Sequence, residues 1–420
     1  MISQGLFIIK KKQLIRMKEH NFLPSTILWD FTKKCNLRCV YCYNDYSNEK
    51  EKHTNSILYG ITPPSKQPDL SIEQIRQKIL PQFKEMKVKS LCLSGGEPLL
   101  RFDDIINLAP DFYRIGLEEV LIDTNGTLLN QKRIELIKKA YKKIPHLYFS
   151  IPLDSLNPIK MAELRPPMKD ILEKTQNSIK LVLKNKLIVT VETVINKVNF
   201  DELEAIINFS KKKGMKCFAE IYPIFSVGRA KDRYDLLLNN RELQEFDRLK
   251  IKNYGKCLTW DFMPFIPEKK VWEKIKNKAR IAQITEGCIA GREYLQLDHA
   301  GNVYPCSFLR LFCGNLLINS LKDIWENNKI LIRFRNRQIT GKCGVCKYKQ
   351  ECGGCRARAF TETGDPYGGV ESCEGGPNGH PLERIFTQKL QKIYKTQYLY
   401  VKMKNLFKKK EVQVSEFNIE

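Results

Sequence analysis

The chain has 420 residues and a mass of 49.0 kDa, which is enough for one large domain and a smaller one. Its net charge of +24 is explained by a solvated, Lys-rich surface; the functional alternative is attraction to an acidic peptide, a polycarboxylate, a membrane surface or nucleic acid. No apolar run reaches the roughly 18–20 residues of a membrane span, and the first residues do not fit a secretory signal. We therefore expect a cytoplasmic protein, in which fourteen cysteines indicate metal binding rather than disulfides.

Short apolar runs alternate with helical patterns between residues 26 and 230. The predicted strands are Thr26–Phe31, Lys89–Ser94, Glu119–Thr124, Leu147–Ile151, Ile188–Val194 and Lys216–Tyr222. The predicted helices are Ser71–Met86, Asp104–Ile115, Gln131–Tyr141, Met168–Lys184 and Asp201–Lys213, the first opening on a capping box of Ser71 and Gln74. This order predicts parallel strand–helix units, either as an incomplete barrel or as an open sheet, with the functional groups at the carboxyl ends of the strands.

The rest of the chain divides by composition. Residues 1–24 form an extension before the 25–230 core, residues 231–285 read as an irregular connector, and residues 286–380 are rich in cysteine and glycine. Residues 381–420 predict a basic, helical tail, which is either a solvated helix packed on the body or a contact for an anionic surface.

Three cysteines follow the first predicted strand in the segment CNLRCVYC. Cys35, Cys39 and Cys42 come from one short loop, whereas a structural zinc site needs four ligands. Three thiolates can instead hold three irons of a [4Fe–4S] cluster and leave the fourth iron open. Zinc with a distant fourth ligand, or simply reduced thiols, is the alternative that spacing alone leaves open.

Two motifs together resemble the radical S-adenosylmethionine (SAM) superfamily. Cys35-x3-Cys39-x2-Cys42, with Tyr41 before the third cysteine, is similar to its cluster signature, and Gly95-Gly96-Glu97-Pro98 is similar to its second motif. The resemblance covers residues 25–230 and implies a partial (β/α)6 TIM-like barrel. It also implies that SAM binds the open iron, and that reductive cleavage of SAM gives a 5′-deoxyadenosyl radical that abstracts hydrogen from a substrate.

The same resemblance implies the contacts to SAM. Gly95, Gly96 and Glu97 would hold its amino group, and Tyr41 would lie against adenine. Asn125 and Arg165 resemble ribose- and carboxylate-contacting positions, and the segment 228–230 (GRA) resembles one near adenine. Pro152 stands where relatives often carry a serine, so we expect Ser150 or Asp154 to replace that contact.

Eight further cysteines lie between residues 288 and 373, and seven of them, all but Cys313, follow a spaced pattern. A zinc ribbon, which with the basic charge would suggest nucleic-acid binding, is the alternative, but five residues between two CxxC pairs are few for opposed zinc knuckles. The run resembles the SPASM extension of radical SAM enzymes, which implies two auxiliary [4Fe–4S] clusters. By that resemblance the first cluster is held by Cys288, Cys306 and Cys355, and the second by Cys343, Cys346, Cys352 and Cys373.

The first auxiliary cluster then lacks a fourth cysteine. We expect Cys257, Asp298, His299 or the substrate at that position. Cys92, Cys217 and Cys313 are interpreted as small core residues. No general base can be assigned; Asp298, Tyr304, Glu192 and Tyr222 are candidates at strand ends or near the clusters.

The resemblance predicts an enzyme, most specifically a maturase-type oxidoreductase that modifies a peptide or protein. Haem-type tetrapyrrole side-chain chemistry is the alternative, because the segments CGGCRARA and TGD also resemble haem-biosynthesis relatives. A non-catalytic iron–sulfur or zinc-binding protein is the second alternative. The expected partners are a peptide or small-molecule substrate, possibly acidic, and a low-potential electron donor such as ferredoxin or flavodoxin. About 24 residues before the first strand are too few for a leader-binding domain, so a separate leader-binding protein is a further expectation.

Overall fold

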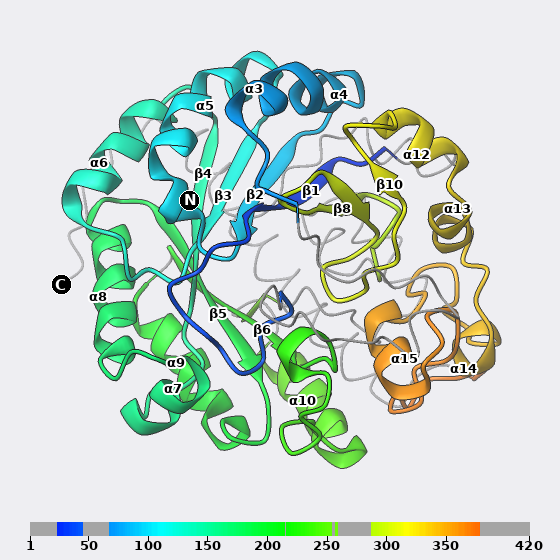
Figure 1. Cartoon of the computed structure of the whole chain (residues 1–420). Helices are drawn as coiled ribbons and strands as arrows, with labels where there is room; N and C mark the ends of the chain where they lie inside the picture. Colours follow the sequence, from blue (N-terminus) through cyan, green and yellow to red (C-terminus); the bar gives the residue numbers. More distant parts are fainter. Residues whose placement is uncertain (1–22, 45–66, 215, 254–256, 259–286, 379–420) are drawn as a thin grey trace, which may run out of the picture.

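The computed structural model describes residues 23–44, 67–214, 216–253, 257–258 and 287–378. A curved sheet with helices on its outer side dominates this part of the chain (Figure 1). The strands lie in the order β10-β9-β8-β1-β2-β3-β4-β5-β6-β7. Their bounds are β1 Thr26–Thr32, β2 Ser90–Gly95, β3 Glu119–Asp123, β4 His146–Pro152, β5 Ile188–Ile195, β6 Cys217–Pro223, β7 Cys257–Leu258, β8 Tyr294–Leu297, β9 Asn302–Tyr304 and β10 Gly314–Asn315.

The predicted partial barrel is confirmed. All six predicted strands are present, and β1 to β6 pair in parallel with their neighbours in sequence order. Alternation along each strand sorts the side chains between two faces. On β2, Leu91 and Leu93 are fully buried in the main hydrophobic core, and Ser94 takes the opposite face. On β3, Val120 and Ile122 do the same, so Asp123 points to the barrel interior.

Helices follow the strands as predicted. The bounds are α3 Ile72–Gln74, η1 Ile75–Ile79, α4 Leu80–Glu85, η2 Pro98–Arg101, α5 Phe102–Arg114, α6 Gln131–Ala140, α7 Pro158–Leu164, α8 Ile171–Lys184, η3 Phe200–Glu202, α9 Leu203–Lys212, η4 Gly228–Ala230, α10 Asn240–Lys252, α12 Leu321–Asn327, α13 Lys329–Arg335, α14 Gly341–Gly344 and α15 Arg356–Thr363. The predicted capping box is present: Ser71 Oγ accepts the Gln74 N–H at 3.1 Å, and Gln74 Oε1 accepts the Ser71 N–H at 2.9 Å.

Two elements depart from the sequence prediction. The helix α7 was not predicted, and α10 lies inside the stretch 231–285 that was predicted to be irregular. Asn239 and Glu242 cap the start of α10 reciprocally, with N···O distances of 2.7 and 2.9 Å. This capping box was overlooked because prolines and aromatic residues dominate the composition of that stretch. The expected tail 381–420, and the extension 1–24 apart from its last two residues, lie outside the described residues.

The cysteine-rich region continues the sheet of the barrel. Strand β8 pairs in parallel with β1 in the register Thr26↔Tyr294, and β9 and β10 complete an antiparallel extension. Helices α12 to α15 then follow on the same side of the molecule (Figure 1). Within the described residues, no helix is long and apolar enough to cross a membrane.

Candidate active site

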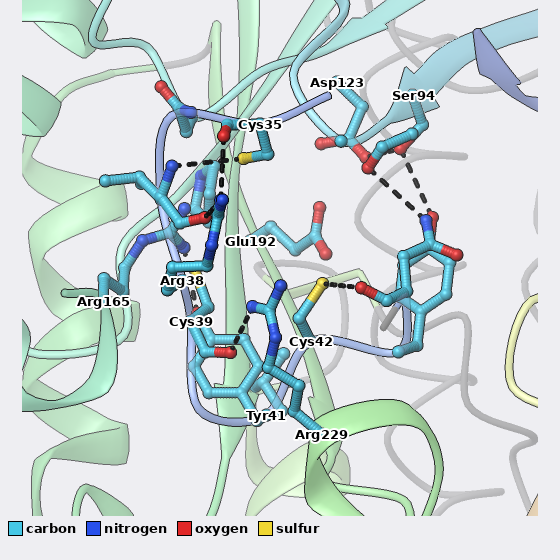
Figure 2. Close-up of a pocket in the computed structure, with 18 of the residues that line it drawn as sticks. Cys35, Arg38, Cys39, Tyr41, Cys42, Ser94, Asp123, Arg165, Glu192 and Arg229 are labelled. Atoms are coloured by element: carbon cyan, nitrogen blue, oxygen red, sulfur yellow. Dashed lines mark hydrogen bonds between the residues drawn. The ribbon is translucent and has the colours of Figure 1, made fainter. Parts of the chain in front are cut away.

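The predicted cysteine motif forms the loop after β1, at the carboxyl end of the barrel. Cys35, Cys39 and Cys42 all line one cavity of about 370 Å³, and Figure 2 shows their side chains around it. The loop is held by the end of α7 and the residues after it, because the Arg38 and Val40 N–H groups donate to the carbonyls of Pro166 and Leu164 at 2.6 and 3.0 Å. The loop is therefore held in shape by backbone contacts from another part of the barrel.

The GGEP motif at the end of β2 forms hydrogen bonds with the backbone where the cysteine loop begins. The Gly96 N–H donates to the Thr32 carbonyl at 2.7 Å, and the Glu97 N–H donates to the Lys34 carbonyl at 2.8 Å. A Cβ at Gly96 would lie 2.1 Å from the Lys34 carbonyl oxygen, far inside any real contact. At Gly95, which has φ +118°, a Cβ would meet the Thr32 oxygen at 2.5 Å. Both glycines are needed, because the backbone of β1 passes directly against Gly95 and the start of the cysteine loop passes directly against Gly96.

The GRA segment fastens the other end of the same loop. The Arg229 N–H donates to the Cys42 carbonyl at 2.9 Å, and Arg229 Nη1 donates to the Cys39 carbonyl at 3.0 Å. Gly228 has φ +56°, and a Cβ there would lie 2.3 Å from the Cys42 oxygen. The sequence resemblance places this segment near adenine; the geometry adds a role in holding the cysteine loop.

The three thiols lie in surroundings that strongly favour their neutral form. Burial raises the pKa of all three, that of Cys42 to about 12, while the nearby Arg165 and Arg229 guanidinium groups partly oppose this. A group that binds them as thiolates must therefore bring its own positive charge, as iron does. Three thiols lining one cavity beside a fixed backbone suit a cluster held by three cysteines, although no group of three or more His, Cys, Asp or Glu side chains in the described part of the chain is already arranged to hold a metal ion.

Several of the residues predicted to contact SAM lie around the same cavity. Tyr41, Gly95, Gly96, Asn125 and Arg165 all line it. Arg165 is 4% exposed, and its Nη1 donates to Asp154 at 3.0 Å and to the Tyr41 hydroxyl at 2.9 Å. Its Nε is buried and has no hydrogen-bond partner among the described residues. A buried cationic donor beside a cavity fits a carboxylate ligand, and the assignment of these residues to SAM remains a prediction.

Glu97 behaves differently from its glycine neighbours. Its carboxylate is fully buried and accepts the Leu99 N–H at 3.0 Å, the Thr124 hydroxyl at 2.7 Å and the Asn125 N–H at 2.8 Å. Burial outweighs these bonds and raises its pKa to about 7. In this arrangement the carboxylate joins the ends of β2 and β3 and orients Asn125. Oε1 accepts two of these bonds and Oε2 only one, so the carboxylate can still accept a further donor, and its contact with the SAM amino group remains a prediction.

Ser150 and Asp154, the two residues expected to substitute for a serine at position 152, are both engaged within the protein. Ser150 donates its hydroxyl to Glu192 at 2.8 Å. Asp154 accepts from Arg165, from the Tyr41 hydroxyl and from the Val194 N–H. Asp154 thus orients two predicted SAM contacts.

The structure brings the later cysteines close together but does not separate them into the two predicted groups. Cys355 packs against both small cores, and the Cys288 N–H donates to the Cys352 carbonyl at 2.9 Å, so the division between two clusters remains a prediction. In the first predicted group, Cys306 and Cys355 pack on the same small core around Leu309. Burial raises the pKa of Cys306 to about 12, and the nearby Cys288 thiol acts in the same direction. In the second, Cys343, Cys346, Cys352 and Cys373 pack together with Tyr348 and Val370. Burial raises the pKa of Cys346, Cys352 and Cys373, and neighbouring thiols of the group raise it further. Ligation itself remains a prediction.

Arg337 lies between the two groups and was missed from the sequence. It is 2% exposed, has φ +50°, and its guanidinium lies against Gly353, which has no side chain to block it. Burial lowers its pKa to about 10, while the nearby thiols of Cys288 and Cys352 act in the opposite direction. A buried cation between sets of thiols would stabilise their thiolate forms. An arginine in the turn after a short helix gives no such signal in sequence.

Three of the candidates for the fourth ligand or the general base have side chains that are engaged within the protein. Asp298 is engaged in the β8–β9 turn: it accepts from the N–H of Ala300 and from the N–H and side chain of Asn302, each at 2.9 Å, and from the Tyr304 hydroxyl at 3.1 Å. His299 Nε2 lies 3.1 Å from a carbonyl oxygen at residue 67. These contacts leave Asp298, His299 and Tyr304 in structural roles.

The other candidates are two residues in the wall of the cavity and the cysteines that were not assigned to a cluster. Glu192 and Tyr222 line the cavity. The Cys257 backbone lies in β7, and its side chain is outside the described residues. Of the cysteines interpreted as core, Cys217 and Cys313 are buried in the main core, whereas Cys92 is half-buried and faces the barrel interior.

The fold and the cysteine groups define an iron–sulfur enzyme, and comparison with protein families gives its class. Residues 29–210 match the radical SAM superfamily, and residues 288–356 match the SPASM iron–sulfur cluster-binding domain. The chain belongs to the radical SAM superfamily and carries a C-terminal SPASM domain. Its cofactors are a [4Fe–4S] cluster with SAM, and auxiliary iron–sulfur clusters.

Individual relatives span most of the chain. An AdoMet-dependent heme synthase of Methanosarcina barkeri is 28% identical over 81% of this chain and 94% of its own length. A PqqA peptide cyclase of Granulibacter bethesdensis is 24% identical over 86% and 90%. The crystal structure of Streptococcus suis SuiB bound to precursor peptide SuiA has the same fold, with a TM-score of 0.58 and 18% identity over 88% of this chain and 84% of that one.

Proposed function

We propose that this enzyme cleaves SAM reductively at the Cys35–Cys39–Cys42 cluster and abstracts hydrogen from a residue of a peptide or protein. The observation that carries the first half is the single cavity lined by the three thiols together with Gly95, Asn125 and Arg165. The bound cluster and SAM supply the radical chemistry. The chain's own residues hold the cysteine loop, present a cationic donor and enclose the site away from water.

The choice of a peptide rests on charge inside the cavity. Asp123 and Glu192 line its wall, and both are half-buried carboxyl groups without an ion pair among the described residues. A propionate group reaching that wall would meet two carboxyl groups, whereas other parts of the same cavity carry basic side chains, Arg165 and Arg229 among them. Relatives named as a peptide cyclase and as a mycofactocin maturase, each aligned over 86% of this chain, also support the proposal.

Tetrapyrrole side-chain modification is the second candidate. The observation that favours it is the higher identity, 28%, to an AdoMet-dependent heme synthase over 94% of that relative. The basic overall charge suits the carboxylates of a tetrapyrrole outside the cavity as well as an acidic leader peptide.

The test uses anaerobically reconstituted enzyme. We expect iron and sulfide for more than one cluster, and 5′-deoxyadenosine after addition of dithionite and SAM. Replacement of Cys42 by alanine should abolish 5′-deoxyadenosine, whereas Cys217→Ala, in the core, should retain it. Incubation with peptides encoded beside the gene, or with a propionate-bearing tetrapyrrole, then shows which one is consumed. Absence of SAM cleavage in the fully loaded wild-type enzyme would refute the proposal.

A further inference from the structure

Four carboxyl groups project from the barrel strands toward its interior. Asp30 on β1 is neutralised, because it pairs with Arg310 at 3.2 Å and accepts from Gln296 at 2.6 Å and from Tyr43 at 3.0 Å. The other three are Asp123 on β3, Glu192 on β5 and Glu220 on β6. In the described part of the chain none of these three forms an ion pair.

These three carboxyl groups, which we call the acidic chamber, lie close together. Glu192 and Glu220 stand directly opposite each other in the β5–β6 pairing. Asp123 lies near enough for its charge to raise the pKa of both glutamates, after burial as the main cause. Figure 2 shows Glu192 pointing into the space between the cysteine thiols and Asp123. The chamber is therefore the inner continuation of the SAM cavity.

The carboxyl groups differ in their partners. Ser94 donates to Asp123 at 2.6 Å, and Ser150 donates to Glu192 at 2.8 Å. Glu220 is 7% exposed and, among the described residues, no donor hydrogen-bonds its carboxylate. Strand alternation gives Glu220 the same face as Tyr222, which lines the cavity. An unpartnered carboxyl group buried beside a cavity, with a like group opposite it, is an arrangement that a ligand cation would stabilise.

An aromatic wall stands over the chamber. The ring of Phe308, which comes from the SPASM domain, lies 5.5 Å from the ring of Tyr222, 4.7 Å from that of Phe225 and 5.5 Å from that of Tyr43, measured between centroids. All four rings line the same cavity. Carboxylates combined with aromatic faces form the usual environment for an organic cation, because the faces carry partial negative charge and exclude water.

We infer that the acidic chamber binds a cationic side chain of the substrate, a lysine ammonium or an arginine guanidinium borne by a peptide. This inference rests on the proposed function and names the substrate class for that site. Asp123, Glu192 and Glu220 neutralise the charge, and Tyr222 and Phe308 flank the alkyl stem. The site holds the charged end deep in the barrel, so that the carbons of the stem lie nearer the cysteine loop.

The experiment measures binding to the reconstituted holoenzyme with SAM, without reductant, so that it does not depend on turnover. The probes are N-acetyl-lysine methylamide and N-acetyl-norleucine methylamide, which differ at the ammonium group, and free lysine, which tests a non-peptide source. The variants are Glu220→Gln and Glu192→Gln. The matched control is Glu119→Gln, a buried carboxyl group of β3 at the other end of the strand.

We expect the lysine derivative to bind at least ten times more tightly than the norleucine derivative and than free lysine. Both chamber variants should remove that preference, the control should keep it, and SAM affinity should stay unchanged in Glu220→Gln and in the control. Equal binding of the two derivatives, or tighter binding of free lysine, would overturn the inference. Weaker SAM binding in Glu220→Gln would also overturn it, because that carboxyl group would then serve the charge of SAM. Failure of the proposed function appears separately, as absence of 5′-deoxyadenosine in the reductive assay.

Discussion

Replacement of Asp154 by asparagine tests the architecture of the candidate SAM site. Asp154 is fully buried and accepts from Arg165 at 3.0 Å, from the Tyr41 hydroxyl and from the Val194 N–H at 3.0 Å. Asparagine keeps the shape but removes the charge, so the Arg165 guanidinium is left buried without its counter-ion. Removing one partner of a buried pair costs about 3–5 kcal/mol. We expect a loss of stability of that size and SAM binding weakened at least tenfold.

The assays for this variant are a urea titration and calorimetric titration with SAM on the reconstituted protein. The matched control is Asp170→Asn, which removes an exposed pair with Lys174 at 2.9 Å on α8. Exposed pairs contribute little to stability, so the control should behave as wild type. If Asp154→Asn unfolds at the wild-type urea concentration and binds SAM with wild-type affinity, Asp154 does not position Arg165.

Two further predictions concern stability and cluster assembly. Burial raises the pKa of Glu119 from 4.5 to about 7, so the folded protein keeps this proton in a pH range where the unfolded chain has lost it. The free energy of unfolding therefore falls as pH rises through this range. Glu119→Gln should remove about 3 kcal/mol of that fall, whereas Glu118→Gln, at a partly exposed position, should not change it. Melting curves at pH 5 and pH 8 measure the difference, and parallel loss in both variants would contradict the assignment. Gly96→Ala places a Cβ 2.1 Å from the Lys34 carbonyl, so reconstitution should incorporate about four fewer irons per chain; Gly376→Ala, with no atom within 4 Å, should load fully, and full loading of both would contradict the role of Gly96.

The parts of the site that are local in sequence were predictable. The cysteine loop and the glycines at the end of β2 follow from spacing and strand order, because the carboxyl ends of parallel strands meet at one edge. The orientation of a side chain that is set by contacts with residues far away in the sequence was not predictable. Arg229 reaches the Cys39 carbonyl across 190 residues of sequence, and Phe308 enters the cavity from the other domain.

Glu97 and Asp123 show what sequence reasoning leaves out. The motif of Glu97 predicts a ligand contact, but its three hydrogen bonds to the protein become visible only in three dimensions. Asp123 could have been found, since it is a charged residue that directly follows the apolar run 120–122 and precedes the TNG segment. A charged residue at the carboxyl end of a barrel strand is a signal that overall composition does not reveal.

The pairing of β1 with β8 has a consequence for biosynthesis. Ser25 and Glu293, which are hydrogen-bonded just before this pairing, lie 268 positions apart. At about 5–20 residues per second, the ribosome exposes β1 roughly 15–50 s before its partner strand emerges. During that interval an unpaired strand edge containing Trp29 and Phe31 is open to pairing with other chains. A protein truncated after the barrel would keep that edge permanently, so we expect it to aggregate, and the nascent full-length chain to depend on a chaperone that shields β1.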